Sequence, residues 1–301
     1  MMTPLSTFAR LDEARAALGC SEVAPYALAI AGGMACRAEE KSWINTSLGL
    51  CLRDGEAGAI AAADVDRLTA FYLDRGLDAR VEVSCHAHES LLKLLGERGY
   101  VPTMFETTFV REIDPKERFE ALVPLGDGIA LEELHVASKP ADEARGRALA
   151  WCVNRAFAPP GVEPREADVE VSMRCMRHAR TRAFAAFAGS ARAEDVVGGG
   201  YLEVVSTRDL AKIDPAFGEM PEVRFAALFG AAVAEPFRKR GVQQALLVRR
   251  LREAQAAGCQ FATIGGLPGA GTERNVRRYG FHVACYKVHM VKQSSAPTAI
   301  A

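Results

Sequence analysis

The chain has 301 residues, 49% of them hydrophobic and 25% charged, a composition typical of globular proteins that leaves enough apolar side chain for two cores. Its formal net charge of −1 argues against a dedicated nucleic-acid binder, because such proteins usually carry a basic excess. The apolar runs fall far short of the roughly 20 residues that a membrane span requires. The N-terminus has early acids and no apolar signal region, so we expect a cytoplasmic protein that binds neither nucleic acid nor membrane.

Eight cysteines are scattered along the chain without a C-x-x-C pair. In a chain of this length they predict reduced, mostly buried thiols rather than a disulfide framework. Their positions are Cys20, Cys36, Cys51, Cys85, Cys152, Cys175, Cys259 and Cys285.

The first segment, residues 1–112, alternates helix and strand signals. Apolar residues at helical spacing with a following glycine predict helices, and β-branched or aromatic runs predict strands. The predicted elements are a helix at 9–18 ended by Gly19, a strand at 26–31, a helix at 63–75, a strand at 79–84, a helix at 90–98 and a strand at 105–110.

Turn formers and charges then gather at 113–128 and predict a linker. The second segment extends to residue 292, and we expect the small, polar tail 293–301 to be disordered. An antiparallel hairpin that leads into strand–helix–strand units makes this segment a mixed α+β domain. Its predicted strands are 129–134, 183–188, 196–205, 225–233, 261–264 and 281–291, and its predicted helices are 141–157, 167–178, 242–257 and 272–278.

The stretch from Val233 to Leu247 is the most informative one for chemistry. It follows an apolar strand and opens a helix, whose first-turn amides lack partners inside the helix and form the positive end of its dipole. Gly241 has no side chain to keep an anion from the backbone, and the basic run at 238–240 adds positive charge at the same end. This helix start therefore suits a diphosphate.

The stretch resembles motif A of the GCN5-related N-acetyltransferase superfamily, a strand followed by R/Q-x-x-G-x-G/A and a helix. Here the pattern reads Arg238-Lys-Arg-Gly241-Val-Gln243, with Gln243 where the family has Gly or Ala. The resemblance implies that backbone amides from about Arg238 to Ala245 hold the pyrophosphate of coenzyme A, with the pantetheine and thioester beside the preceding strand. The cofactor-binding residues it implies are Val233, Ala234, Glu235, Arg238, Lys239, Arg240, Gly241, Val242, Gln243, Gln244 and Ala245.

A second match extends from Thr272 to Phe281 and resembles the final helix and Gly-Phe of the family, in the variant Ser-x-Arg-x-x-x-Lys-x-Gly-Phe. Many members place a tyrosine on this helix, four residues before the Gly, to protonate the leaving thiolate. Val276 stands at that position here, so the general acid is open between Tyr279 and Tyr286. We choose Tyr286, on the predicted last strand.

The first segment bears a fainter likeness to the same strand–helix–strand ending but has no R-x-x-G-x-G/A loop. The chain thus resembles bacterial tandem members of the superfamily, with an α+β fold of two tandem domains, each a mixed, mostly antiparallel sheet flanked by helices. The predicted division is a degenerate domain at 1–112, a linker at 113–128, a catalytic acetyltransferase domain at 129–292 and the tail. Without the phosphate-binding loop, the first domain should not bind coenzyme A well.

Two other motifs invite different interpretations. The stretch from Gly265 to Thr272 lacks the Lys of a P-loop and the Rossmann spacing, so we interpret it as a flexible loop rather than a nucleotide site. Cys85-His86-Ala-His88 has the composition of a metal site, but no further ligand cluster is evident near it in the sequence. We therefore interpret it as a helix-start loop with incidental histidines and predict no metal.

Four further titratable residues remain open. Glu203 and Glu222 lie near strands that flank the acceptor channel in this family, where either could relay a proton from the incoming ammonium or be an ordinary surface carboxylate. His282 and His289 lie along the predicted last strand, where a histidine is usually structural.

The resemblance implies direct transfer, in which an acceptor amine attacks the thioester carbonyl of bound acetyl-coenzyme A while a backbone N–H near Val233 polarises that carbonyl. Two alternatives stay open: a non-catalytic acyl-coenzyme A-binding module, and a DNA-associated factor that would use Arg249, Arg250 and Arg252. The acceptor, a small-molecule or peptide amine, is not identified, nor is the choice between monomer and homodimer. A carboxylate in place of Gly241 should abolish coenzyme A binding in a folded domain, because it would repel the anion.

Overall fold

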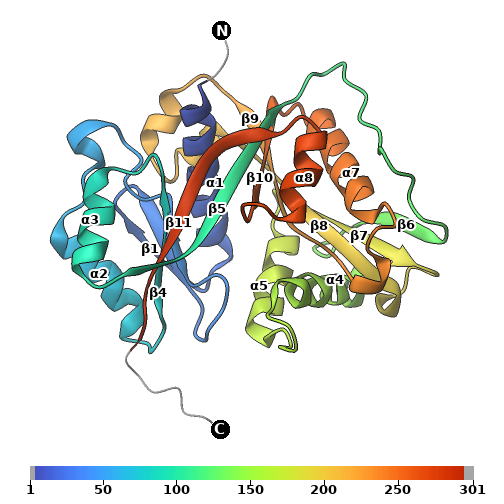
Figure 1. Ribbon diagram of the computed structural model, residues 1–301, viewed down its shortest axis with the longest axis horizontal. Helices are drawn as coiled ribbons and strands as arrows, with labels where there is room; N and C mark the ends of the chain where they lie inside the picture. The colour runs from blue at the N-terminus through green and yellow to red at the C-terminus, as the bar shows by residue number, and fades with distance from the viewer. Residues whose placement is uncertain (1–3, 295–301) are drawn as a thin grey trace. The chain divides into compact units, whose positions relative to one another are not determined.

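The computed structural model describes residues 4–294 (Figure 1). The chain forms two compact units, and neither is continuous in sequence. Within the described residues, the first unit consists of 4–109, 207–222 and 266–294, and the second of 110–206 and 223–265. The predicted domain ranges follow the order of the chain, whereas the compact units exchange segments: the last strand lies in the first unit. Apart from Gln293 and Ser294, the predicted disordered tail lies outside the described residues.

The first unit contains a mixed, mostly antiparallel sheet in the order β1-β2-β3-β4-β11-β5. β3 pairs with β4 in parallel, and the pairs β1–β2, β2–β3 and β4–β11 are antiparallel. The strands are β1 (Tyr26–Ile30), β2 (Gly33–Arg37), β3 (Thr46–Leu48), β4 (Ala79–Ser84), β11 (His282–Lys292) and β5 (Val101–Glu112), of which β5 ends in the second unit.

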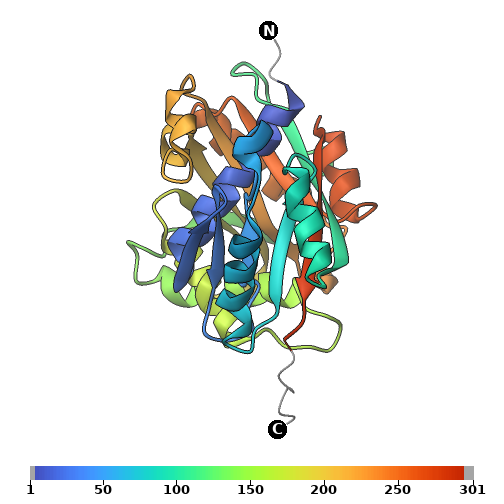
Figure 2. The ribbon, with the colours of Figure 1, turned by 90° about the vertical axis from the view of Figure 1, so that its left-hand side faces the viewer.

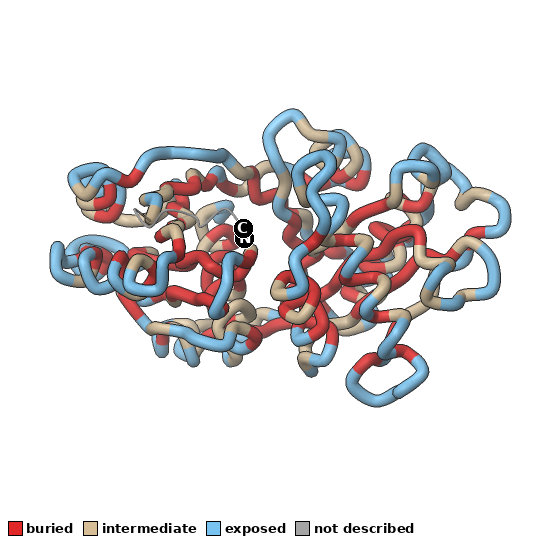
Figure 3. The backbone as a smooth tube through the Cα atoms, turned by 90° about the horizontal axis from the view of Figure 1, so that it is seen from below, coloured by how far each residue is buried: buried red, intermediate tan, exposed pale blue. Residues whose placement is uncertain are grey.

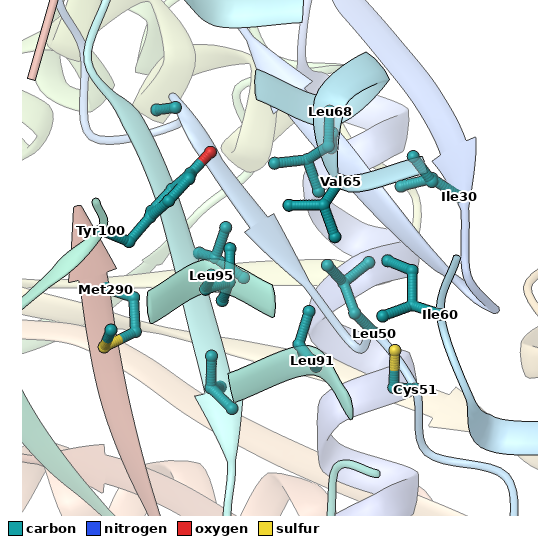
Figure 4. Packing of buried hydrophobic residues seen from close by; sticks show 14 of the residues in the cluster. Ile30, Leu50, Cys51, Ile60, Val65, Leu68, Leu91, Leu95, Tyr100 and Met290 are labelled. Atoms are coloured by element: carbon teal, nitrogen blue, oxygen red, sulfur yellow. The ribbon is translucent and has the colours of Figure 1, made fainter. Parts of the chain in front are cut away.

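Helices cover both faces of this sheet (Figures 1 and 2). On one face, Val65 and Leu68 of α2 (Ala62–Leu73) and Leu91 and Leu95 of α3 (Glu89–Glu97) build the core that Figure 4 shows. The other face carries α1 (Leu5–Val23), which packs on β2, β3 and β11. The short helices α6 (Thr207–Leu210) and α8 (Gly271–Arg278) also belong to this unit.

A network of buried charges lies within the first unit. The ammonium of Lys287 on β11 lies 3.2 Å from a carboxylate oxygen of Glu13 on α1 and 3.5 Å from one of Glu82 on β4. His289 contacts the carboxylate of Glu106 at 3.2 Å. Burial alone would lower the pKa of Lys287, but the carboxylates of Glu13, Glu106 and Glu82 outweigh it and raise that pKa well above its usual value.

The second unit has the same plan, with the sheet order β10-β9-β8-β7-β6. Its one parallel pair is β9 with β10, and the other pairs are antiparallel. Helices α4 and α5 cover one face and α7 packs on the other (Figure 1). The central strands of this sheet are mostly buried, and Figure 3 shows exposed residues mainly along the outside of the backbone. The elements are β6 (Ile129–Leu134), α4 (Asp142–Phe157), α5 (Glu166–Arg177), β7 (Thr181–Ala188), β8 (Val196–Ser206), β9 (Arg224–Val233), α7 (Val242–Ala256) and β10 (Phe261–Gly266).

The predicted linker 113–128 runs along α7 and is called the strap here (Figure 1). Phe119 in its middle is buried, at 4% exposure. Its hydrogen bonds include those from Arg252 to the carbonyl of Phe119 (2.9 Å), from Gln255 to the carbonyl of Asp114 (2.7 Å), from the N–H of Val123 to Gln244 (3.1 Å) and from the N–H of Gly126 to the carbonyl of Arg240 (2.9 Å). The strap is thus part of the second unit.

The predicted fold class is confirmed: both units are mixed, mostly antiparallel sheets flanked by helices. Most predicted elements are present within a few residues of their expected ends. The helix predicted to stop at Gly19 continues to Val23, because the residues beyond the glycine keep packing on the unit. The short strands β2 and β3 were not predicted. No helix among residues 4–294 has the length and apolar character needed to cross a membrane.

We expect the buried charge network around Lys287 to contribute to the stability of the first unit. Lys287→Met keeps the length of the side chain but leaves Glu13 and Glu82 buried without their cation, which should cost about 3–5 kcal/mol of unfolding free energy. Burial already raises the pKa of Glu13 to about 7, and Lys287 is the group that lowers it. Without the ammonium this pKa rises further, so the loss should be largest above about pH 7 and shrink as the pH falls below it.

Urea unfolding at about pH 5 and about pH 8 measures the effect. Lys292→Met, on the same strand and half-exposed, is the control and should cost little. Equal losses in the two variants, or a loss independent of pH, would contradict the role given to Lys287.

Candidate functional site

The parallel strands of the second unit separate part-way along their length. β9 pairs with β10 from Phe225 to Leu228, whereas β9 itself continues to Val233. Beyond Leu228, the described residues offer β9 only β8 as a strand partner. The other edge of β9 therefore presents backbone N–H and C=O groups that are available to a ligand.

A β-bulge lies within this open stretch. Gly230 and Ala231 of β9 stand opposite a single residue of β8, Gly200. Gly230 has φ +56°, and a Cβ on it would lie 2.5 Å from the ring of Tyr201, so only glycine fits. Bulges redirect the groups of a strand, and they recur beside active sites.

The loop after β9 leads into α7, and the tip of this helix is bare. Its N-cap residue, Gly241, makes no side-chain cap, and its first turn contains no acidic residue. The backbone N–H groups of Gly241, Val242 and Gln243 donate to no acceptor among residues 4–294. Unpartnered amides and the positive end of the helix dipole together make a place for an anion.

The basic run before the helix is exposed and has no carboxylate partner within the described residues. The guanidinium of Arg238 donates to the carbonyl of Val233 at 3.3 Å, and that of Arg240 donates to the carbonyl of Asp127 at 3.0 Å. These bonds fix the two side chains without neutralising their charge. Lys239 has φ +62°, a left-handed conformation that turns the chain just before the helix.

The strap closes one side of the helix tip. Gly241 has φ +74°, and a Cβ on it would lie 2.3 Å from the carbonyl oxygen of Pro124. A substitution of Gly241 must therefore move the strap, so the Gly241→Glu variant is not a clean test of anion repulsion. Nothing in the sequence of 113–128 marks this contact, because its partners lie more than a hundred residues away along the chain.

The structure narrows the set of amides available to a phosphate. The N–H of Ala245 donates to the carbonyl of Gly241 at 2.9 Å, and the N–H of Arg238 donates to the carbonyl of Glu235 at 3.2 Å. Ala234 uses its N–H in the sheet. The side chain of Gln244 is buried and accepts a hydrogen bond from the strap. The open donors are thus centred on 241–243.

The tyrosines considered as proton donors lie in the first unit. Tyr286, on β11, is 54% exposed, and its hydroxyl has no hydrogen-bond partner among the described residues. Tyr279 is buried, at 7% exposure, and so is Val276, at the position of the family's tyrosine. Of these, only Tyr286 presents its side chain to solvent.

Several other candidates are engaged structurally. Glu203 is buried and lies 3.2 Å from the guanidinium of Arg180, and Glu222 forms an ion pair with Arg208 at 2.9 Å. His289 belongs to the buried charge network of the first unit, whereas His282 is exposed.

The loop before α8 does not have the properties of a nucleotide site. The carboxylate of Glu273 accepts a hydrogen bond from the N–H of Gly269 at 2.8 Å, so a negative charge already stands at this helix start. A phosphate would be repelled from it.

The arginines that a DNA-associated factor would need are also engaged. Arg250 is fully buried and donates to the carbonyls of Leu246 and Tyr201. Burial lowers the pKa of Arg250 to about 10. Arg249 pairs with Glu253 at 2.7 Å, and Arg252 holds the strap. These side chains do not form a basic surface.

Comparison with solved structures finds similar folds. A GCN5-related N-acetyltransferase from Kribbella flavida matches over 93% of this chain and 95% of its own, with a TM-score of 0.56 and 14% identity. One from Sphaerobacter thermophilus matches over 72% of this chain and 59% of its own, with a TM-score of 0.47 and 16% identity. A tandem GNAT protein from the clavulanic acid biosynthesis pathway matches over 73% and 65%, with a TM-score of 0.47 and 13% identity. The chain thus spans less than two thirds of the length of the last two, and it matches no family model and no curated protein.

The contact of Gly241 with the strap makes a second prediction. Gly241→Ala should destabilise the chain by about 1–3 kcal/mol more than Gly258→Ala does. Both glycines have φ near +74°, so both variants carry the same left-handed strain of about 1–2 kcal/mol. Only at Gly241 does the new Cβ also meet a backbone carbonyl, because a Cβ at Gly258 has no neighbour within 4 Å. Denaturant unfolding of both variants measures the difference, and equal losses would show that the strap yields without cost.

Proposed function

Because the chain has the fold of the GCN5-related N-acetyltransferases, we propose that it transfers the acetyl group of acetyl-coenzyme A to an amine. The bare amides at the start of α7 carry this proposal. They lie at the carboxyl end of β9, whose outer edge is open beyond Leu228. Acetyl-coenzyme A carries an anionic diphosphate, which suits the bare amides of α7. Its pantetheine arm has hydrogen-bonding groups, which suit the open edge of β9.

In this proposal the diphosphate accepts hydrogen bonds from the N–H groups of 241–243, and Arg238, Lys239 and Arg240 supply positive charge. The pantetheine arm lies along the open edge of β9, where its amides can bond to the strand as another strand would. The thioester carbonyl then reaches the bulge at Gly230 and Ala231, where a backbone N–H can polarise it.

The acceptor amine attacks the thioester directly, and coenzyme A leaves as a thiol. Attack requires a neutral amine, so a base or a water chain must take the ammonium proton. The ion pair of Glu203 with Arg180 makes this carboxylate a weak candidate for that base. Direct transfer gains its rate from holding the amine and the thioester together and from the fixed dipoles around the carbonyl.

A non-catalytic acyl-coenzyme A-binding module is the second candidate. The buried Val276 at the position of the family's tyrosine favours it. Release of free thiol from acetyl-coenzyme A, measured against a broad panel of small and peptide amines, separates the two functions. Amine-dependent release supports the transferase, whereas tight binding without release for any amine supports the binding module.

The phosphate-binding role of the helix tip can be tested without disturbing Gly241. Gln243 lies in the first turn of α7 and is half-buried. Gln243→Glu places a carboxylate beside the bare amides, where the helix dipole favours it, so the fold should be at least as stable as that of the wild type. The same charge should weaken coenzyme A binding by about tenfold or more, because it repels the diphosphate.

The matched control is Gln243→Ala, which removes the same amide side chain without adding charge. Calorimetric titration with coenzyme A and with pantetheine, which lacks the diphosphate, measures the effect. Affinity for coenzyme A should fall in Gln243→Glu and not in Gln243→Ala, and affinity for pantetheine should stay the same in both variants. Equal affinities of the two variants for coenzyme A would refute the phosphate site.

Tyr286 is proposed as the donor of a proton to the leaving thiolate. Tyr286→Phe should lower kcat by about 10²–10⁴-fold while leaving the affinity for coenzyme A unchanged, because the hydroxyl acts on the leaving group and not on the diphosphate. Tyr279→Phe is the control, since this side chain is buried, and it should retain activity. Full activity of Tyr286→Phe would assign the proton to water or to another group.

A further inference from the structure

The turn after β4 and the strand β11 bring three metal-binding side chains together in the first unit. Cys85 and His86 follow β4 directly, and Cys285 lies on β11. The register of the antiparallel pair sets Ser84 opposite Lys287, so the residues just beyond Ser84 lie beside Cys285. The two sulfur atoms are 3.3 Å apart, and a ring nitrogen of His86 lies within 4.8 Å of both.

The three side chains differ in how far they are already engaged. The Sγ of Cys285 donates to the carbonyl of Tyr286 at 3.1 Å and lies 3.3 Å from the hydroxyl of Ser84. Both cysteines are free thiols, with Cys85 exposed and Cys285 buried. The imidazole of His86 has no hydrogen-bond partner among the described residues. His88, by contrast, is engaged: its Nδ1 accepts a hydrogen bond from the N–H of Ser90 and caps α3. The set is therefore Cys85, His86 and Cys285, without His88.

The sulfur–sulfur distance distinguishes a disulfide from a pair of metal ligands. A disulfide requires about 2.05 Å, so the sulfurs would have to approach by more than 1 Å from their 3.3 Å separation. Two thiolates bound to one tetrahedral zinc ion at zinc–sulfur distances of about 2.3 Å have their sulfurs about 3.8 Å apart. This differs from the observed 3.3 Å by only about 0.5 Å. The arrangement is closer to metal ligation than to a covalent bond.

We propose that Cys85, His86 and Cys285 bind a soft divalent cation, of which Zn²⁺ is the natural probe. Two thiolates and an imidazole are the donors that zinc prefers, and they select against Mg²⁺ and Ca²⁺. The fourth position would be open to solvent on the side of the exposed Cys85. Binding releases the two thiol protons to solvent and joins β4 to β11, 200 residues apart in the chain.

The proposal departs from the prediction of no metal, which considered Cys85, His86 and His88 and found no further ligand cluster near them in the sequence. Cys285 completes the set, and only the pairing of β11 with β4 brings it there. The metal site shares no residue with the tip of α7, but it adjoins the proposed proton donor, because Cys285 precedes Tyr286 and the N–H of Cys85 donates to the carbonyl of Tyr286 at 2.9 Å. Zn²⁺ binding is measured without acetyl transfer, so the failure of either proposal leaves the other standing.

The test uses the full chain, reduced, stripped with a chelator and titrated with Zn²⁺ alone. The wild type should bind one ion per chain, and Co²⁺ in its place should give thiolate-to-metal charge-transfer absorption. Cys85→Ser should weaken binding by more than about 100-fold, because even the loss of an outer-shell partner of a metal ligand costs about 10–100-fold. Cys85 is exposed, so this variant should fold.

His86→Ala should weaken binding as well. Cys20→Ser and His282→Ala, which remove a thiol and an imidazole elsewhere in the first unit, should leave it unchanged. Failure of the reduced wild type to bind Zn²⁺, or equal affinity in Cys85→Ser, overturns the proposal. A Cys85–Cys285 disulfide after peroxide treatment, in a protein that binds no metal when reduced, would identify a redox pair and also count against it.

Discussion

The parallel pairing of β9 with β10 is the constraint from which the candidate site follows. Two parallel strands cannot be joined by a tight turn, so the chain needs a crossover, and here the crossover is α7. The crossover must begin at the carboxyl end of β9 and return along the sheet. This requirement places the positive end of a helix dipole beside the stretch of β9 that β10 leaves unpaired. The anion site and the open strand edge are two results of one topology.

Contacts with the strap fix the backbone at the start of α7. Gln244 and Arg240 bind the strap from the first turn and from the loop before it. The Pro124 carbonyl then occupies the space where a side chain at position 241 would stand. One side of the tip is thus closed by backbone, and the amides of 241–243 are left without acceptors in the described part of the chain, residues 4–294. Position 241 therefore requires a glycine because of its contact with the strap, whether or not a ligand also approaches it.

The sequence predicts those parts of the fold that depend on neighbouring residues. The strand 129–134 and the helix 242–257 are observed almost as predicted, because apolar spacing and flanking glycines act over a few residues. The superfamily resemblance, stated from the Arg238 to Gln243 pattern, is confirmed as a likeness of fold. The strand β3 escaped prediction because three residues carry too little pattern to distinguish a strand from a loop.

Features that depend on distant contacts could not be predicted in this way. The exchange of β11 into the first unit, the contact of Pro124 with Gly241 and the meeting of Cys285 with Cys85 each join residues more than a hundred positions apart. No local pattern carries this information. The same limit applies to Gln244, whose polar side chain suggests exposure, although it is buried against the strap.

The comparison of the two crossovers shows why the two units should differ in their affinity for an anion. Each unit has a parallel strand pair joined by a connection that contains a helix: β3 and β4 with α2 in the first, and β9 and β10 with α7 in the second. The first turn of α2 contains Asp64, and its N-cap is Ala61. The first turn of α7 contains no acid, its N-cap is Gly241, and three basic residues precede it.

A carboxylate at a helix N-terminus already satisfies the dipole that would otherwise attract a phosphate, and it repels a second negative charge. In the first unit this place is taken by Asp64, whose partner is Arg67 at 3.6 Å. In the second unit the same place is empty of acid and bordered by uncompensated cations. The common topology therefore places a helix start after a parallel strand in each unit, and of these two helix starts that of α7 is the one without an acid in its first turn.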